Sequence, residues 1–314
     1  SFWDAPFMFP EPAIIAYSDN LVGSTPFYSL FRIFGSDRET SFQFWVITMY
    51  VLNYSCAYLY LNWQFKNKQA AVLGALVFAC SMAIQSQMTH VQTFPRFPIP
   101  LALWMAMLFI KELKPIYLFG SILMVVYQFY CAIYLGFFLL VPISMLLFLG
   151  LLSKRKLLLV FIKNIKWLGL MGGSVILNIL FILPLMLPYY KRAKLAGMNS
   201  YENIVGTLPT IRSFFYSQKG SFLWSSLSEV GSDYPAPWDH QIFTGGIAII
   251  SLIIFITILG AVYLFKKKLN SIKFQSSTLI FGIVIIITFL LFTRYQGFSF
   301  YQVLFKLPGF GSMR

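Results

Sequence analysis

The sequence predicts an all-α fold, a polytopic bundle of transmembrane helices. Of its 314 residues, 58% are hydrophobic and 19% aromatic, and the mean hydropathy is +0.73. Charged residues make up 11% of the chain, against roughly 25% in soluble domains. Apolar stretches of about 20 residues, the length that crosses the hydrocarbon core of a bilayer, recur along the chain. This composition excludes an ordinary soluble domain.

Apolar stretches predict about eight spanning helices. The stretch at 97–110 is short and begins with Pro98 and Pro100, which predicts a tilted or broken helix. Residues 116–152 are either two spans joined by a tight turn or one span with a re-entrant half, and the sequence leaves both open. The expected spans are 40–62, 70–87, 97–110, 116–131, 133–152, 165–188, 242–265 and 277–293.

Charge placement predicts the membrane topology. Short loops near residues 63–69, 111–115, 153–166 and 266–273 are rich in Lys and Arg, which indicates the cytoplasmic side. The alternate segments carry every acidic residue except Glu112. The net charge of +14 is spread over these short clusters and forms no basic patch, so we expect a lipid bilayer partner and no nucleic acid.

The domain organisation follows from this topology. We expect an external acidic loop at 1–39, transmembrane helices at 40–188, a long external loop at 189–241, further transmembrane helices at 242–293 and an external tail at 294–314. Aromatic residues in the external loops predict short helices lying along the bilayer interface. The expected location is the cytoplasmic (inner) membrane, with several passes and a site on the external, periplasmic side. The chain begins with Ser1 and ends on "PGFGSMR", so we expect a piece truncated at both ends.

Three carboxylates in the opening segment are candidate catalytic residues. Asp4, Glu11 and Asp19 lie close together in a Pro-rich external loop. A desolvated carboxylate there would have a raised pKa and could act as a general base, or Glu11 and Asp19 could share a divalent cation such as Mg²⁺ or Mn²⁺. The alternative is that Asp19 and Asn20 cap a helix starting at Leu21 and that the other two acids are solvated.

Candidate phosphate-binding residues lie in three other external stretches. "QSQMTHVQTFPRF" brings His90 and Arg96 to an outer turn, where they would grip a phosphate or instead serve as an interface histidine and a snorkelling arginine. "PYYKRAK" places basic residues outside, against the usual charge bias, and Arg294 opens a second external basic set. Anionic lipid headgroups would explain these cations, and a solvated helix end is the alternative. The second stretch contributes Tyr189, Lys191 and Arg192.

Sequence signatures of soluble enzymes are missing from the chain. There is no Walker sequence, no HExxH and no GxSxG, and "GFGSM" is too short for a dinucleotide fingerprint.

A succession of motifs resembles a known membrane family. "FMFPEPAIIAYSDNLVGSTPFY", "HVQTFPRFPIPLALW", "YQFYCAIYLGFFLLVP", "LPYYKRAKLAGMNSYENIV", "PWDHQIFTGGIAII" and "LPGFGSMR" follow one another as in bacterial proteins of the YfhO type, relatives of the GT-C glycosyltransferases. The resemblance implies an external acidic site and a sugar donor linked to polyprenyl phosphate. By this resemblance Glu11 and Asp19 are the candidate acids. The family's main aspartate often follows a first spanning helix, which here would precede Ser1.

The sequence therefore predicts a GT-C-like glycosyltransferase that moves a sugar from a polyprenyl-phosphate carrier to a glycan or protein acceptor of the cell envelope. Asp19 or Glu11 would deprotonate the acceptor, and Arg96, Lys191 and Arg192 would hold the phosphate. Two alternatives remain open. One is a transporter or flippase for lipid-linked intermediates, and the other is a non-catalytic accessory membrane protein.

Overall fold

Helices dominate the fold, as the sequence predicts. In the computed structural model the described residues are 3–4, 10–87, 90–197, 200–234, 236–264, 276–307 and 309–312. Within them the only sheet is an antiparallel pair of two-residue strands, β1 (Arg294–Tyr295) and β2 (Phe298–Ser299). The longer helices are α1 (Thr25–Ile33), α2 (Arg38–Phe65), α3 (Lys68–Cys80), α5 (Pro98–Glu112), α6 (Pro115–Cys131), α7 (Ile133–Ser153), α9 (Ile165–Ala196), α12 (Gly246–Leu264) and α13 (Ser276–Phe292).

Short helices fill the connections between the longer ones. They are η1 (Ile14–Tyr17), α4 (Met82–Gln85), η2 (Val91–Thr93), α8 (Arg155–Phe161), α10 (Tyr201–Val205), η3 (Ile211–Phe215), η4 (Ser225–Glu229), α11 (Pro237–His240), α14 (Tyr301–Phe305) and η5 (Phe310–Ser312).

In the part of the chain that the structure describes, five helical segments are long and apolar enough to cross a membrane. They are Arg38–Phe65, Lys68–Gln85, Val91–Glu112, Ile133–Ser153 and Ile165–Leu195. The other expected spans also fall on apolar helices, but the described parts of these are shorter: Pro115–Cys131, Gly246–Ile258 and Leu279–Phe292. By helix length and hydropathy the chain is a multi-pass membrane protein.

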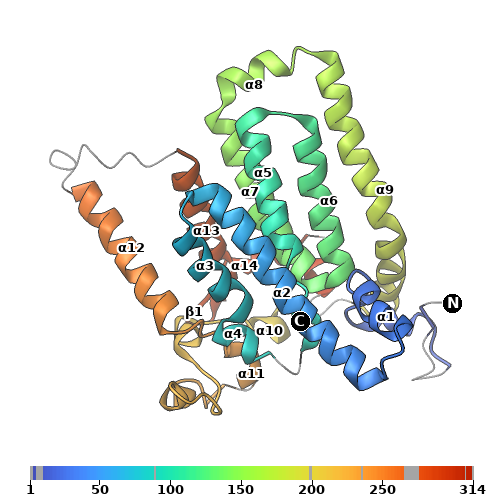
Figure 1. Ribbon diagram of the computed structural model, residues 1–314, viewed down its shortest axis with the longest axis vertical. Coiled ribbons are helices and arrows are strands. Elements are labelled where there is room, and N and C mark those ends of the chain that lie inside the picture. Colours follow the sequence, from blue (N-terminus) through green and yellow to red (C-terminus); the bar gives the residue numbers. More distant parts are fainter. Residues whose placement is uncertain are drawn as a thin grey trace.

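Tight turns join successive helices into antiparallel pairs. Lys66 ends α2 in the left-handed conformation, and the Asn67 side chain then accepts the Ala70 N–H to start α3. Leu113 ends α5 in the same conformation, and Pro115 follows at the first turn of α6. The turn between α5 and α6 and helix α8 lie toward the top of Figure 1, whereas α1, α10 and α11 lie toward the bottom.

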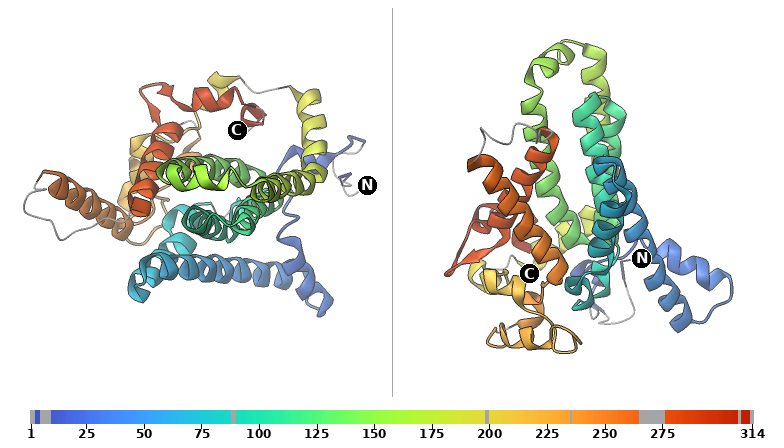
Figure 2. Two further views of the ribbon diagram at one scale, coloured as in Figure 1. Left: turned by 90° about the horizontal axis from the view of Figure 1, so that it is seen from above. Right: turned by 60° about the vertical axis from the view of Figure 1, so that its left-hand side comes forward.

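The break at Ala132 settles the local structure of residues 116–152. Ala132 is extended, with φ −161° and ψ 120°, so α6 ends at Cys131 and α7 starts at once in a new direction. The two helices then pack against each other (Figure 2). The stretch therefore forms two helices joined by a tight turn.

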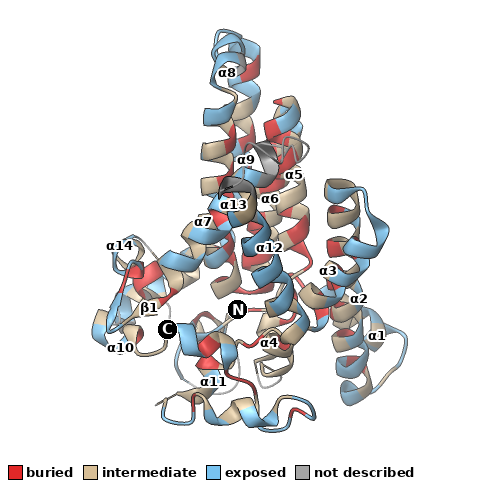
Figure 3. Cartoon of the chain, turned by 90° about the vertical axis from the view of Figure 1, so that its left-hand side faces the viewer, coloured by how far each residue is buried: buried red, intermediate tan, exposed pale blue. Residues whose placement is uncertain are grey.

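The main hydrophobic core runs along α5, α6 and α7. Ala102, Ala106, Phe129 and Leu146 are buried there, and Leu185 of α9 joins them. Figure 3 shows buried residues gathered on these helices, whereas α12 lies apart from them in Figure 1 and has an apolar, exposed surface. Exposed apolar helix surfaces of this extent suit contact with lipid.

Candidate functional site

The opening segment is anchored against the junction between α6 and α7. The side chain of Asn20 donates to the carbonyl of Phe129 (3.3 Å), and the N–H of Gly23 donates to the carbonyl of Tyr130 (2.7 Å). A Cβ on Gly23 would lie 2.8 Å from Sγ of Cys131 and 3.0 Å from its backbone nitrogen, so only glycine allows this approach. These contacts fix the position of Asp19, which precedes Asn20.

Asp19 caps the first turn of α7 from a distant part of the chain. Its Oδ1 accepts the N–H of Ile133 at 2.5 Å, and the N–H of Tyr134 also interacts with the carboxylate. The N-terminus of a helix carries free N–H groups and a partial positive charge, both of which favour a carboxylate. Oδ2 of Asp19 is buried and has no hydrogen-bond partner among the described residues.

Burial raises the pKa of Asp19 to about 6, although the two backbone N–H groups act in the opposite direction. Such a carboxylate changes its protonation state close to neutral pH. The alternative, that Asp19 and Asn20 cap a helix starting at Leu21, is wrong. Leu21 has φ 55°, and α1 begins only at Thr25, with Pro26 in its first turn. The Asp19 carboxylate therefore does not cap α1 and is available to cap α7.

Tyr189 of α9 joins the site from the other side. Its hydroxyl donates to the carbonyl of Ser18 (2.6 Å) and lies 3.4 Å from Nδ2 of Asn20. The ring of Trp3 meets the Tyr189 ring edge-on at 5.8 Å between centroids. The carboxylate of Asp19 is near enough to interact electrostatically with the Tyr189 hydroxyl. Two candidates from distant parts of the sequence, Asp19 and Tyr189, are thus brought together.

Glu11 and Arg192 form a second contact between the opening segment and α9. Nη1 of Arg192 lies 3.9 Å from Oε2 of Glu11, and the same oxygen accepts the Tyr17 hydroxyl at 3.1 Å. The guanidinium of Arg192 also lies 3.4 Å from the centre of the Tyr17 ring. Glu11 is about half exposed, whereas the Arg192 side chain is 18% exposed and its Nε is buried without a partner in the described chain.

Asp4 and Lys191 flank this arrangement. Oδ1 of Asp4 accepts the N–H of Ala13 at 2.8 Å, so this exposed acid shapes the loop before η1. Lys191 is exposed beside Arg192 at the end of α9. The structure therefore gathers Asp4, Glu11, Asp19, Tyr189 and Arg192 around the opening segment.

Arg96 lies elsewhere, between α2 and α5. Its backbone N–H donates to Asn53 (3.0 Å), and its Nε donates to the carbonyl of Thr93 (2.5 Å). Among the described residues it forms no ion pair and no hydrogen bond with Glu11, Asp19 or Tyr189. The expected shared phosphate site of Arg96 with Lys191 and Arg192 is not assembled by direct contacts.

His90 and Arg294 belong to a third region, next to the long segment 200–241, which we call the outer loop after its expected side of the membrane. Arg294 donates from its N–H to the carbonyl of Pro209 (2.7 Å) and from Nη1 to that of Val205 (3.3 Å). His90 lies close enough to Asp239 of α11 to affect its charge, and Nδ1 of His90 is 3.4 Å from Nε2 of Gln92. These two candidates therefore surround the outer loop and not Asp19.

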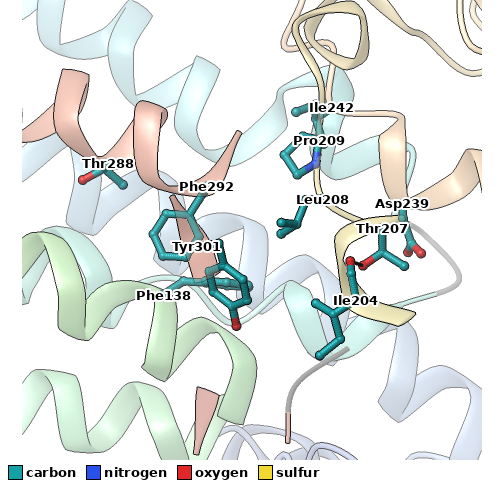
Figure 4. Close-up of a pocket in the computed structure, with 10 residues that line it drawn as sticks. All are labelled: Phe138, Ile204, Thr207, Leu208, Pro209, Asp239, Ile242, Thr288, Phe292 and Tyr301. Atoms are coloured by element: carbon teal, nitrogen blue, oxygen red, sulfur yellow. Dashed lines mark hydrogen bonds between the residues drawn. The ribbon is translucent and has the colours of Figure 1, made fainter. Parts of the chain in front are cut away.

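A cavity of about 360 Å³ lies in this third region, between α7, α13 and the outer loop (Figure 4). Its polar lining comes from Thr207, Asp239, Thr288 and Tyr301. Sequence reasoning missed these residues, and the adjacent Asp239 and His240 in "PWDHQIF" are the one signal that could have raised them. The apolar lining consists of Phe138, Ile204, Leu208, Pro209, Ile242 and Phe292.

The fit to a divalent cation is poor. No group of three or more His, Cys, Asp or Glu that could hold a metal ion occurs in the part of the chain that the structure describes. Glu11 is bound to Arg192 and Tyr17, and Asp19 is bound to the start of α7, so the two carboxylates face different partners. We derive no step through a metal, and an Mg²⁺ or Mn²⁺ requirement stays a prediction.

In comparisons with known proteins, no family model, curated protein or solved structure matches this chain. The resemblance to the YfhO type and to GT-C enzymes therefore stays a prediction.

Proposed function

We propose that this protein is a membrane-embedded glycosyltransferase of the GT-C kind, which moves a sugar from a polyprenyl-phosphate carrier to a hydroxyl of a cell-envelope acceptor on the external side. The observation that supports it best is Asp19, a desolvated carboxylate whose pKa is raised to about 6 and whose Oδ2 is unpaired among the described residues. A general base works best when its pKa lies near the working pH.

The proposed reaction assigns one task to each side chain. Asp19 takes the proton of the acceptor hydroxyl, whose oxygen then attacks the anomeric carbon of the sugar. The bond from that carbon to the phosphate oxygen breaks, and the polyprenyl phosphate leaves with the electron pair. Arg192 and Lys191 stabilise the negative charge of the leaving phosphate, and the Tyr189 hydroxyl lies between them and Asp19 in the proposed site.

Proximity to one another supports this choice of residues. Tyr189 bonds to Ser18 and Asn20, which flank Asp19 in the sequence, and Arg192 follows Tyr189 by less than one helical turn. Arg96, His90 and Arg294 contact none of these groups in the described part of the chain, so the proposal gives them no role in holding the phosphate.

The expected topology of eight spans with external loops is part of the proposal. It would put Asp19, Tyr189 and Arg192 on the external face of the cytoplasmic membrane, together with the outer loop at 200–241. Labelling single cysteines introduced at Glu11 and at Lys156 with a membrane-impermeant reagent tests it. We expect labelling from the external side only at position 11. Labelling only at position 156 would show that the chain has the opposite orientation in the membrane.

The proposal is tested by Asp19→Asn in membranes supplied with polyprenyl-phosphate sugars. The amide retains the shape and can still accept the Ile133 N–H, so the fold is preserved while the base is lost. We expect sugar transfer to fall by roughly 10²- to 10⁴-fold. Glu229→Gln, at an exposed acid of the outer loop, is the matched control and should retain full activity.

Unchanged transfer by Asp19→Asn would overturn the assignment of the base. If the native protein moves the carrier lipid between leaflets but transfers no sugar, the flippase function replaces the glycosyltransferase function. Absence of both activities, with the protein folded and required for polymer assembly, would favour the accessory role.

A further inference from the structure

The cavity beneath the outer loop has the lining of a binding site for a small amphiphile. Its centre is apolar, formed by Phe138, Phe292 and the ring of Tyr301 in Figure 4. Its volume of about 360 Å³ lies at the lower end of the range for small-molecule pockets, roughly 300–1,000 Å³. Apolar walls of this kind bind a hydrocarbon segment by the hydrophobic effect.

Among the described residues that line the cavity, Asp239 is the only one with a formally charged side chain. It lies at one side of the cavity in Figure 4, next to Thr207. No Lys or Arg forms an ion pair with Asp239 in the described chain. A partly buried carboxylate without a cationic partner favours a ligand that brings the positive charge.

Two histidines are the titratable neighbours of Asp239. Burial raises the pKa of the Asp239 carboxyl, and the charges of His240 and His90 act against that rise. His240 cannot turn toward a ligand, because Nδ1 lies 2.9 Å from Oγ of Ser213 and Nε2 lies 3.1 Å from the carbonyl of Gly206. Burial also lowers the pKa of His240, so near neutral pH its imidazole is uncharged and supplies no positive charge beside Asp239.

The opposite side of the cavity ends at a hydroxyl. Oγ1 of Thr288, on α13, is buried and has no hydrogen-bond partner among the described residues. The Thr207 hydroxyl donates to the carbonyl of Ile204 at 2.9 Å. Its oxygen, Oγ1, can therefore only accept a hydrogen bond from a ligand beside Asp239. The Asp239 end is therefore rich in acceptors, and it has no donor for a phosphate among these lining side chains.

We propose that this cavity binds an amphiphile made of an apolar chain and a protonated primary amine. The ammonium group donates to the Asp239 carboxylate and the Thr207 oxygen, and the chain lies between Phe138, Phe292 and Tyr301. A phosphate head would face an unpaired carboxylate, so this site is separate from the anion-binding residues Lys191 and Arg192. The inference does not depend on the proposed glycosyl transfer.

Calorimetric titration of the purified full chain in detergent tests the proposal with three probes of equal chain length. These are hexylamine, 1-hexanol and hexyl phosphate, all short enough to stay in water. We expect hexylamine to bind tenfold or more tightly than 1-hexanol, since the alcohol can still donate a hydrogen bond to Asp239 but brings no positive charge to the carboxylate. Hexyl phosphate should bind most weakly.

Two variants locate the ligand. Asp239→Asn keeps the shape of the side chain and should reduce the affinity for hexylamine to that for 1-hexanol, whereas Glu229→Gln on the same loop should change neither. Ile242→Phe narrows the cavity and should abolish binding of both probes, with helix content checked by circular dichroism. Unchanged hexylamine affinity in Asp239→Asn or in Ile242→Phe would overturn the proposal, as would hexyl phosphate binding as tightly as hexylamine or no hexylamine binding to the native chain.

Discussion

Replacing Asp19 by asparagine should make the protein more stable near neutral pH while removing its proposed activity. In the folded protein the pKa of this carboxyl is raised from 3.8 to about 6. The protonated form is thus the one that folding favours, and an ionised Asp19 is better solvated in the unfolded chain. The stabilising contribution of the protonated carboxyl is complete below pH 3.8 and is lost as the pH rises through about 6.

The size of the effect follows from the same values. Each pKa unit corresponds to about 1.36 kcal/mol, so the rise from 3.8 to about 6 amounts to about 3 kcal/mol of unfolding free energy. Asp19→Asn carries no titrating group and should escape this loss. At pH 8 we expect it to be more stable than the native protein by up to about 3 kcal/mol, since the amide still accepts the Ile133 N–H.

Denaturant unfolding in detergent, followed by tryptophan fluorescence at several pH values between 4 and 8, measures the difference. The native and Asp19→Asn curves should coincide near pH 4 and separate as the pH rises. Glu229→Gln, whose carboxylate is exposed, should follow the native curve throughout. If the unfolding free energy of Asp19→Asn changes with pH in the same way as that of the native protein, or if the variant is less stable at pH 8, the desolvation that we assign to Asp19 is refuted.

Four further predictions concern the contacts around the two sites. Gly23→Ala should lower the free energy of unfolding by about 1–3 kcal/mol, because its Cβ would press on Cys131; denaturant titration against Gly220→Ala, at an open position, measures the difference, and equal stabilities would contradict the close contact. Glu11→Gln should change the free energy of unfolding by less than about 1 kcal/mol, because the pair with Arg192 is half exposed. Arg192→Gln should lower kcat for sugar transfer more than it raises KM for the lipid-linked donor, because Arg192 is proposed to stabilise the charge on the leaving phosphate, and kinetics in which only KM changes would remove this role. Burial lowers the pKa of His240, so the contribution of its neutral imidazole to stability is complete above pH 6.5 and is lost as the pH falls through that lowered pKa. Limited proteolysis of the 200–241 loop should therefore become faster in acid, and His240→Phe should remove this pH dependence.

Local sequence predicted the helices well. Seven of the eight expected apolar stretches each fall on one helix, and the stretch 70–87 falls on two, α3 and α4, which are separated by the extended Ser81. Spanning length and apolar composition act within a few positions, so local sequence shows them. The choice between one and two helices in 116–152 depended on the backbone of Ala132. No Pro or Gly marks that break, so the sequence could not decide it.

The sites depend on contacts between residues far apart in the chain. Asp19 was singled out as a desolvated acid, but its partner Ile133 is 114 positions away, and no local pattern points to it. Grouping Arg96 with Lys191 and Arg192 rested on the expectation that all three lie on the external side. The fold separates them. The Arg96 backbone is hydrogen-bonded to Asn53 of α2, whereas Arg192, at the end of α9, contacts Glu11 of the opening segment. Asp239 was missed, because its cavity exists only where α7, α13 and the outer loop meet.

The pH dependence of sugar transfer tests the assignment of Asp19 most directly. In proteoliposomes supplied with a polyprenyl-phosphate sugar, kcat/KM should fall tenfold per pH unit below about 6, as the Asp19 carboxylate becomes protonated. A rate that stays constant from pH 7 to pH 5 would mean that Asp19 does not accept the proton.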